Sequence, residues 1–181
     1  QVYFIDNDDF FQRKALVCDE SGVDFVDNDE RSIFFVRGVI ETVRKLRWTP
    51  DIVHCHGWFS ALTPLYIKKA FDDDPYFREA KVIYSIYDDA FDSNFRKLFN
   101  RKLLLEGIEQ EDIEEIKNKA DYVNLSKLAI RYADGIIQAS QKINSKVKKA
   151  AEESGKPFMI ANESEDFSDY GEFYDLLLEQ A

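Results

Sequence analysis

The chain has 181 residues, a length typical of one domain and sufficient to bury a core. Hydrophobic residues make up 45% of it and aromatic residues 14%, which is too apolar a composition for an intrinsically disordered protein. The 35 acidic residues outnumber the 24 Lys and Arg, and the net charge of −11 argues against nucleic acid or an anionic membrane as the main partner. We therefore expect residues 1–181 to form a single globular domain.

The two cysteines, Cys18 and Cys55, lie far apart and lack the spacing of a zinc site or a disulfide framework. This usage is typical of a reducing compartment, so we expect a cytoplasmic protein, and we expect no metal or other cofactor. No apolar stretch reaches the ~18–20 residues that a membrane-spanning helix needs, and no signal peptide opens the chain. Because the chain begins without Met, we expect that a segment before Gln1 is missing.

The first part of the chain predicts one strand and one long helix. Residues 2–5 alternate β-branched and aromatic side chains, as strands do, and a run of polar residues then ends the pattern. A polar loop continues to about Asp29, where acidic residues suit the N-terminus of a helix. Apolar residues recur at three- and four-residue steps from Ile33 to Leu46, and Pro50 prevents the helix from continuing.

Short apolar strands and amphipathic helices alternate in the rest of the chain. We expect strands at residues 51–55, 81–86, 135–139 and 157–161, and helices at 59–71, 95–106, 111–119, 122–132, 143–153 and 170–179. Helices of about 10–15 residues between short buried strands favour right-handed crossovers onto a parallel sheet. The sequence therefore predicts a doubly wound α/β domain with a parallel sheet, in which residues 90–133 form a helical insertion.

Ligands of open parallel sheets bind beyond the carboxyl ends of the strands, so the residues there are the candidates for a site. Both histidines of the chain, His54 and His56, fall at one strand end, and the two-residue period of a strand directs them to the same side. They could form one site, or one of them could be a core residue bonded to a backbone carbonyl. Gly57 leaves room for a ligand to approach the backbone amides that follow. A third metal ligand is missing locally, so no metal site is expected.

Two further strand ends carry polar residues. Tyr87, Asp88 and Asp89 follow the strand at 81–86, where a carboxylate can accept a sugar hydroxyl, act as a base or cap a helix. Ser140 follows the strand at 135–139 and is interpreted as a helix cap. No glycine-rich dinucleotide or P-loop motif is present in the chain.

Two other features are interpreted as structural. Trp48 and Trp58 can stack on sugar rings, but both follow the spacing of packed residues. The acidic runs at 109–115 and 163–166 are interpreted as solvated surface.

Four segments carry a resemblance to a known family. Residues 2–13 are similar to a strand of the family and the D-x-x-x-x-x-x-R loop that follows it, and residues 26–35 to its x-D-N-x-x-R-F helix start. The strongest signal is W-T-P-D-I-V-H-C-H-G-W at 48–58, which is similar to the family's W-x-P-D-V-V-H-x-H-D-W, and Y-A-D-G-I-I-Q-A-S at 132–140 is similar to its Y-A-D-x-I-x-x-V-S. In order and spacing, these segments resemble the N-terminal, Rossmann-like half of bacterial glycogen synthases and plant starch synthases, the family 5 glycosyltransferases of GT-B fold.

The resemblance implies transfer of glucose from ADP-glucose to the non-reducing end of an α-1,4-glucan, with retention. The positions that it assigns to the binding of substrate are His54, His56, Gly57, Trp58, Tyr87 and Asp88. Three of them depart from the family pattern: Gly57 stands where the family has an Asp important for catalysis, Tyr87 where it has a His, and Asp88 where it has an Asn.

Other parts of the family pattern are absent. The K-x-G-G loop that holds the donor phosphate belongs to a first strand upstream of Gln1, and a second Rossmann domain with a basic pair and a glutamate does not fit in the ~40 residues that follow residue 140. The acidic chain also has no basic cluster to stabilise a leaving diphosphate.

Three interpretations follow. The first is a glycosyltransferase domain, with a separate chain as the possible carrier of the second domain. Another is a catalytically incompetent relative that binds glucan or docks a partner. An unrelated flavodoxin-like binding protein is a third interpretation, which the H-x-H-G-W segment argues against.

Overall fold

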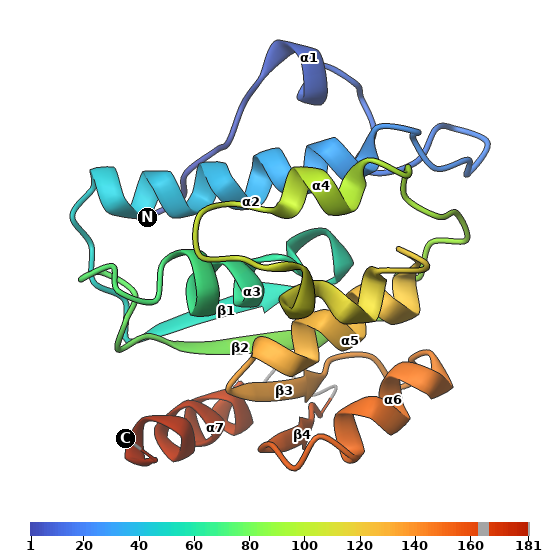
Figure 1. The fold of residues 1–181 in the computed structure, drawn as a ribbon. Coiled ribbons are helices and arrows are strands. Elements are labelled where there is room, and N and C mark those ends of the chain that lie inside the picture. Colours follow the sequence, from blue (N-terminus) through green and yellow to red (C-terminus); the bar gives the residue numbers. More distant parts are fainter. Residues whose placement is uncertain (163–166, 181) are drawn as a thin grey trace.

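The computed structural model describes residues 1–162 and 167–180, so the acidic run at 163–166 lies outside the described residues. In the described part, a parallel sheet has four strands in the order β1 (Ile52–His56), β2 (Lys81–Ile86), β3 (Gly135–Gln138) and β4 (Phe158–Ile160) (Figure 1). Val53 pairs with Val82, and Tyr84 pairs with Ile136. The predicted α/β class with a parallel sheet is confirmed.

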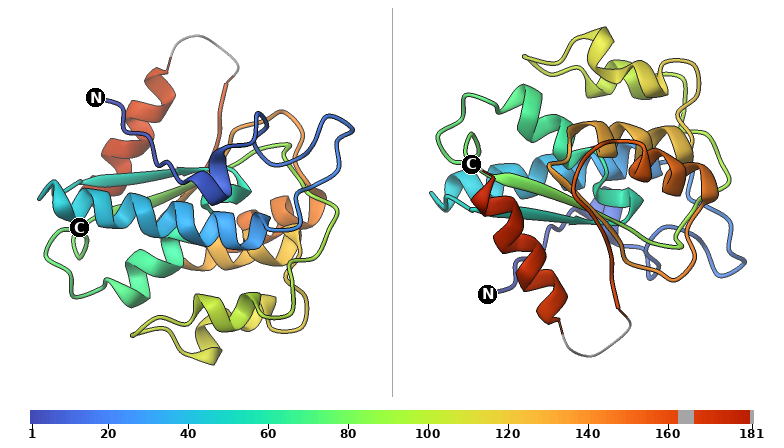
Figure 2. Two further views of the ribbon diagram at one scale, coloured as in Figure 1. Left: turned by 90° about the horizontal axis from the view of Figure 1, so that it is seen from above. Right: turned by 90° about the horizontal axis from the view of Figure 1, so that it is seen from below.

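The central strands β2 and β3 are buried on both faces, and their side chains alternate between the two sides of the sheet. Val82, Tyr84 and Ile86 point into the larger core, whereas Ile83 and Ile137 point to the opposite face. The larger core is covered by helices α2 (Asn28–Lys45), α3 (Thr63–Leu65), α5 (Tyr122–Tyr132) and α6 (Ser145–Glu152), and the opposite face by α7 (Ser168–Glu179) (Figure 2). Helices therefore lie on both sides of the sheet, as in a doubly wound fold.

Helix α7 is held on its face by a small apolar cluster. Phe173 and Leu177 are buried against Ile83 and Ile137. A Cβ atom on Gly135 would lie 2.6 Å from a methyl group of Leu177, so the absence of a side chain at Gly135 allows the helix to approach the sheet closely.

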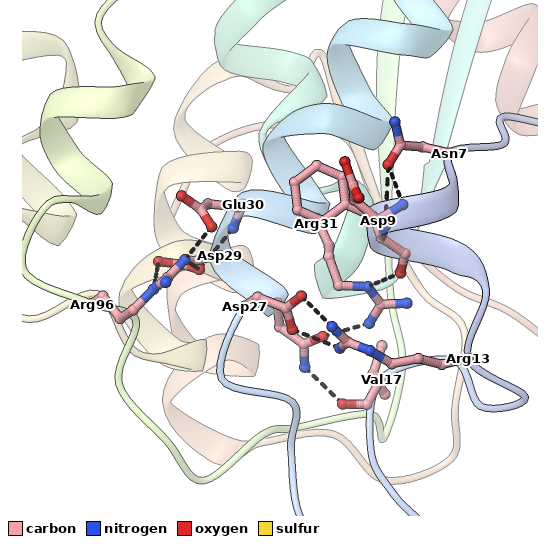
Figure 3. A network of polar contacts seen from close by, with 11 residues as sticks. Asn7, Asp9, Arg13, Val17, Asp27, Asp29, Glu30, Arg31 and Arg96 are labelled. Carbon is pink, nitrogen blue, oxygen red and sulfur yellow. Dashed lines mark hydrogen bonds and ion pairs between the residues drawn. The ribbon is translucent and has the colours of Figure 1, made fainter.

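A buried arginine ties the N-terminal segment to the start of α2 (Figure 3). The Arg31 guanidinium is fully buried and donates hydrogen bonds to the Phe10 carbonyl at 2.9 Å and to Asn28 Oδ1 at 2.7 Å. Arg13 forms a bidentate pair with Asp27, which lowers the pKa of that carboxyl through hydrogen bonding. Asp27, Asn28 and Arg31, which belong to the segment at 26–35 that resembles the family, therefore have a structural role here: they hold the N-terminal segment against α2.

A second ion pair joins the segment after β2 to the same helix end. Asp29 is 1% exposed and accepts two hydrogen bonds from Arg96, at 2.8 and 2.6 Å. Arg96 also contacts Glu30 at 2.6 Å (Figure 3). The segment carries α4 (Phe99–Leu103), which packs on α2, and η3 (Gln110–Ile116), a 3-10 helix that packs on α5.

The prediction of a strand at residues 2–5 is wrong. Val2 is 77% exposed and Phe4 89% exposed, and the described strands do not pair with these residues. A strand needs a neighbour for its backbone hydrogen bonds, which alternation in the sequence cannot supply. Ile5 packs on α2, where its side chain lies 3.0 Å from the Cβ position of Gly38. The short helix α1 (Asp8–Phe11), capped by Asn7, lies in the predicted loop.

Three predicted helices are shorter or of another type than expected. The segment at 59–71 consists of η1 (Trp58–Ser60), α3 and the π-helix η2 (Tyr66–Ala70), and the helix predicted at 95–106 is only α4. The helix predicted at 111–119 is the 3-10 helix η3. Apolar residues three and four apart fit several helix types, so the spacing did not distinguish them. Gly107, at the end of the segment predicted as a helix at 95–106, has φ +89°, and its missing Cβ allows close approach of the Lys69 carbonyl, 2.5 Å from the Cβ position.

The two tryptophans differ in their surroundings. Trp58 is 3% exposed and packs among Phe59, Phe91 and Phe95, as expected for a packed residue. Trp48 is 56% exposed, so its predicted burial is wrong. The helix that set its spacing ends at Lys45, and Trp48 therefore leaves the buried side of α2.

Candidate functional site

The two histidines lie together at the carboxyl end of β1, on the face of the sheet that α7 covers. Their rings stack with centroids 4.1 Å apart and an angle of 29° between the planes. One residue separates them in the strand, so the alternation of side chains places both rings on the same side, as predicted.

Hydrogen bonds to hydroxyl groups fix both rings. His54 bonds through Nδ1 to the hydroxyl of Tyr174 at 2.6 Å and through Nε2 to Oγ of Ser85 at 2.7 Å. His56 bonds through Nδ1 to the hydroxyl of Tyr87 at 2.8 Å. The ring nitrogens of His54 are thus occupied by side chains rather than by a backbone carbonyl, and the two rings connect β1, β2 and α7.

The surroundings of the histidine pair favour the neutral form of both rings. Burial, and then the neighbouring His56, lower the pKa of His54 to about 4. Burial also lowers the pKa of His56. A neutral imidazole has one donor and one acceptor nitrogen. Within residues 1–162 and 167–180, Nε2 of His56 has no hydrogen-bond partner, so this nitrogen can bind a ligand.

A cavity of about 500 Å³ opens beside the pair. It is lined by His54, His56, Tyr87, Phe167, Tyr170, Gly171 and Tyr174. These described lining residues carry aromatic rings and neutral polar groups but no Lys, Arg, Asp or Glu. Another cavity, of about 630 Å³, lies between residues 3–17 and α2. We assign the candidate site to the smaller cavity because it lies at the strand ends, where parallel sheets bind ligands.

The turn after β1 brings Gly57 against Asp89. Gly57 has φ +69° and ψ 176°, a conformation open almost only to glycine. Oδ2 of Asp89 accepts a hydrogen bond from the Trp58 N–H at 3.1 Å, and Oδ1 accepts one from the Tyr122 hydroxyl at 3.3 Å. Burial raises the pKa of the Asp89 carboxyl. The space that was expected to admit a ligand at the amides after Gly57 holds this carboxylate.

The cap interpretations of the other strand ends are partly wrong. Asp89 does not cap a helix that follows it; it accepts a hydrogen bond from the N–H of Trp58, the first residue of η1, which lies 31 residues earlier in the chain. Asp88 is exposed, and its N–H donates to Oγ of Ser140 at 3.1 Å. Ser140 therefore does not cap α6, whose N-cap is Asn144.

Five residues of the cavity and its hydrogen bonds were not predicted as site residues: Ser85, Phe167, Tyr170, Gly171 and Tyr174. Tyr170 and Tyr174 are four residues apart and share one side of α7, a spacing that shows they could act together. Ser85 is the second-to-last residue of β2, and a serine in an otherwise apolar buried strand is the signal that could have identified it. No local pattern in the sequence predicts that α7 lies over the histidine pair.

The described residues form neither a cluster that could bind a metal ion nor a helix that could span a membrane. Within residues 1–162 and 167–180, no three His, Cys, Asp or Glu side chains are grouped so that they could hold a metal ion. None of the helices in this part has the length and apolar character needed to cross a membrane.

Comparisons with known proteins agree on one family. The sequence model of the family described as "Starch synthase catalytic domain" matches residues 1–157. The glycogen synthase of Chlorobaculum parvum is 31% identical over 142 residues, which are 77% of this chain and 28% of that protein. The glycogen synthase of Chlorobium phaeobacteroides is 30% identical over 155 residues, which are 85% of this chain and 31% of that protein. The matched part thus spans less than a third of these relatives.

A solved structure shows the same fold. The catalytic domain of starch synthase IV from Arabidopsis thaliana, bound to ADP and acarbose, superposes with a TM-score of 0.56 at 18% identity. The superposition covers 75% of this chain and 30% of that chain.

Proposed function

Because the chain belongs to the family of starch synthase catalytic domains, we propose that it is part of a glycosyltransferase that transfers glucose from ADP-glucose to an α-1,4-glucan. The observation that carries the proposal is the stacked pair of His54 and His56, which lies at the strand ends of a parallel sheet within the matched residues 1–157. Neutral imidazole and phenol groups suit the hydroxyl groups of a sugar, since both can donate and accept hydrogen bonds.

The nucleotide part of the donor needs groups that lie elsewhere. Positive charge or backbone N–H groups must stabilise a leaving diphosphate, and the described residues that line the cavity include no Lys or Arg. We therefore propose that a second domain, in this protein or in a separate chain, supplies these groups. Residues 1–181 then act as one Rossmann-like domain with an insertion at 90–133, and the cytoplasm is the proposed location.

A glucan-binding or partner-docking module without turnover is the second candidate function. It is favoured by the turn at Gly57, which has no side chain of its own and is filled by Asp89. Gly57, Trp58, Tyr87 and Asp88 remain proposed substrate positions together with the histidines, although the indole of Trp58 is buried and only the backbone of this residue faces Asp89.

The test is incorporation of labelled glucose from ADP-glucose into glycogen by the chain together with the domain that supplies the diphosphate-binding groups, with the glycogen synthase of Chlorobaculum parvum as the positive control. Turnover that is lost in His56→Ala but kept in Tyr76→Phe supports the glycosyltransferase. Retention of the chain on glycogen without turnover supports the binding module. If the protein shows no turnover and is not retained on glycogen, both proposed functions are contradicted.

A further inference from the structure

Helix α7 contributes to the cavity although it lies outside the residues that match the family. The match ends at residue 157, and α7 begins at Ser168. Four of the seven described lining residues nevertheless come from this helix and the residue before it: Phe167, Tyr170, Gly171 and Tyr174. More than half of the residues that line the site therefore lie outside the part of the chain that matches the family.

The two tyrosines of α7 are placed differently. Tyr174 interacts with the protein itself: its hydroxyl forms a hydrogen bond with His54 at 2.6 Å, and its ring lies at 88° to that imidazole. Tyr170 lies 6.1 Å from His54 and 6.0 Å from Phe167, measured between ring centroids. In the described part of the chain, the Tyr170 hydroxyl has no hydrogen-bond partner. Tyr170 and Nε2 of His56 are thus the polar groups that the cavity leaves for a ligand.

The lining indicates a neutral ligand rich in hydroxyl groups. Aromatic faces bury the apolar C–H face of a sugar ring, and a phenol and an imidazole can bind its hydroxyl groups. An anionic ligand would need a cation to offset the loss of its hydration, and the described lining residues include none.

We propose that α7 completes a binding site for a neutral pyranose ring, and that Tyr170 is a ligand-positioning residue of this site. The choice of an α-glucan as the probe rests on the proposed function. The ring lies between Tyr170 and the pair formed by His56 and Tyr87, and Gly171 leaves the space for it. A Cβ atom on Gly171 would have nothing within 4 Å, so the helix presents open volume to the cavity at that position.

The experiment is a titration of the chain with maltoheptaose, followed by NMR of the histidine ring protons, with ADP as a second ligand. Tyr170→Phe removes only the hydroxyl and should weaken maltoheptaose binding by about 3- to 10-fold, the value of one neutral hydrogen bond. Gly171→Leu should abolish binding by filling the cavity, while its unfolding midpoint stays the same or rises because leucine favours a helix. Tyr76→Phe, in a partly buried tyrosine outside the cavity, should bind as the unchanged chain does.

Each outcome has one meaning. Maltoheptaose binding that is weakened by Tyr170→Phe and lost in Gly171→Leu supports the site, even if no glucose is transferred and the proposed function fails. No binding of maltoheptaose, equal binding by all variants, or binding of ADP alone would overturn it, whatever the transfer assay shows.

Discussion

A Cβ atom on Gly57 would lie 2.4 Å from Oδ2 of Asp89, so the carboxylate of one loop occupies the place of a side chain on the other. The loop after β1 is also joined to the end of β2 by a hydrogen bond from the Gly57 N–H to the Ser85 carbonyl at 3.0 Å. A carboxylate is thus present at this strand end, but it comes from residue 89. An Asp introduced at position 57 would have to displace it.

Gly57→Ala is expected to lower the free energy of unfolding by about 2–4 kcal/mol, because it combines a glycine-only backbone conformation with a steric clash. Gly155→Ala is the matched control, since Gly155 has φ +70° and nothing within 4 Å of its Cβ position. Its cost should be only about 1 kcal/mol. Urea denaturation measures both, and equal costs would show that Asp89 does not restrict position 57.

Acid should destabilise the protein through His54 before the carboxylates protonate. The pKa of His54 is about 4 in the folded state and about 6.5 in the unfolded state, so the unfolded state takes up the proton first. Stability is therefore lost as the pH falls from about 6.5 to 4, by about 2 kcal/mol for this partly exposed group. The raised pKa of Asp89 acts in the opposite direction.

The measurement for this pH dependence is urea denaturation between pH 4.5 and 7.5. His54→Gln should be less stable at pH 7, because two hydrogen bonds change, but should show a flatter dependence on pH. An unchanged slope in this variant would assign the acid sensitivity to other groups. Asp89→Asn separates the opposing contribution.

Leu177→Ala should loosen α7 from the sheet. Leu177 is 2% exposed in the cluster with Ile83 and Ile137, and the loss of its side chain should cost about 2–4 kcal/mol. Leu176→Ala removes the same side chain from the next position, which is 45% exposed, and should cost less than about 0.5 kcal/mol. Denaturation gives the two costs, and hydrogen exchange should show faster opening of α7 in Leu177→Ala alone. Similar results for both variants would argue against the packing of this helix.

Arg96→Ala should leave the buried Asp29 carboxylate without its main partner. We expect a loss of about 2–3 kcal/mol in the free energy of unfolding, because Asp29 is 1% exposed. Arg78→Ala breaks the pair with Glu79, whose side chains are 61% and 84% exposed, and should cost less than about 0.5 kcal/mol. Asp29→Asn in the Arg96→Ala background should recover part of the loss. No recovery would indicate that the arginine acts through packing instead.

The buried strands could be predicted closely from the sequence. The strand predicted at 81–86 has these bounds in the structure, because a strand covered on both faces is encoded as a continuous apolar run. Residues 2–5 carry an equally good strand pattern and form none, since a strand also depends on a neighbour. Of the four helices predicted between β1 and β3, the one at 122–132 is confirmed with its bounds, whereas the other three differ in length or type because their short turns are shaped by the core against which they pack.

The sequence by itself determined that His54 and His56 face the same side of a strand end, because the geometry of an extended chain sets that relation locally. The tertiary structure alone decided what surrounds them. Tyr174 reaches His54 across 120 residues, and Asp89 reaches Trp58 across 31. Such contacts depend on the crossover of the chain and on where α7 packs, and neither is encoded in the spacing of neighbouring residues, since packing joins surfaces that are distant in sequence.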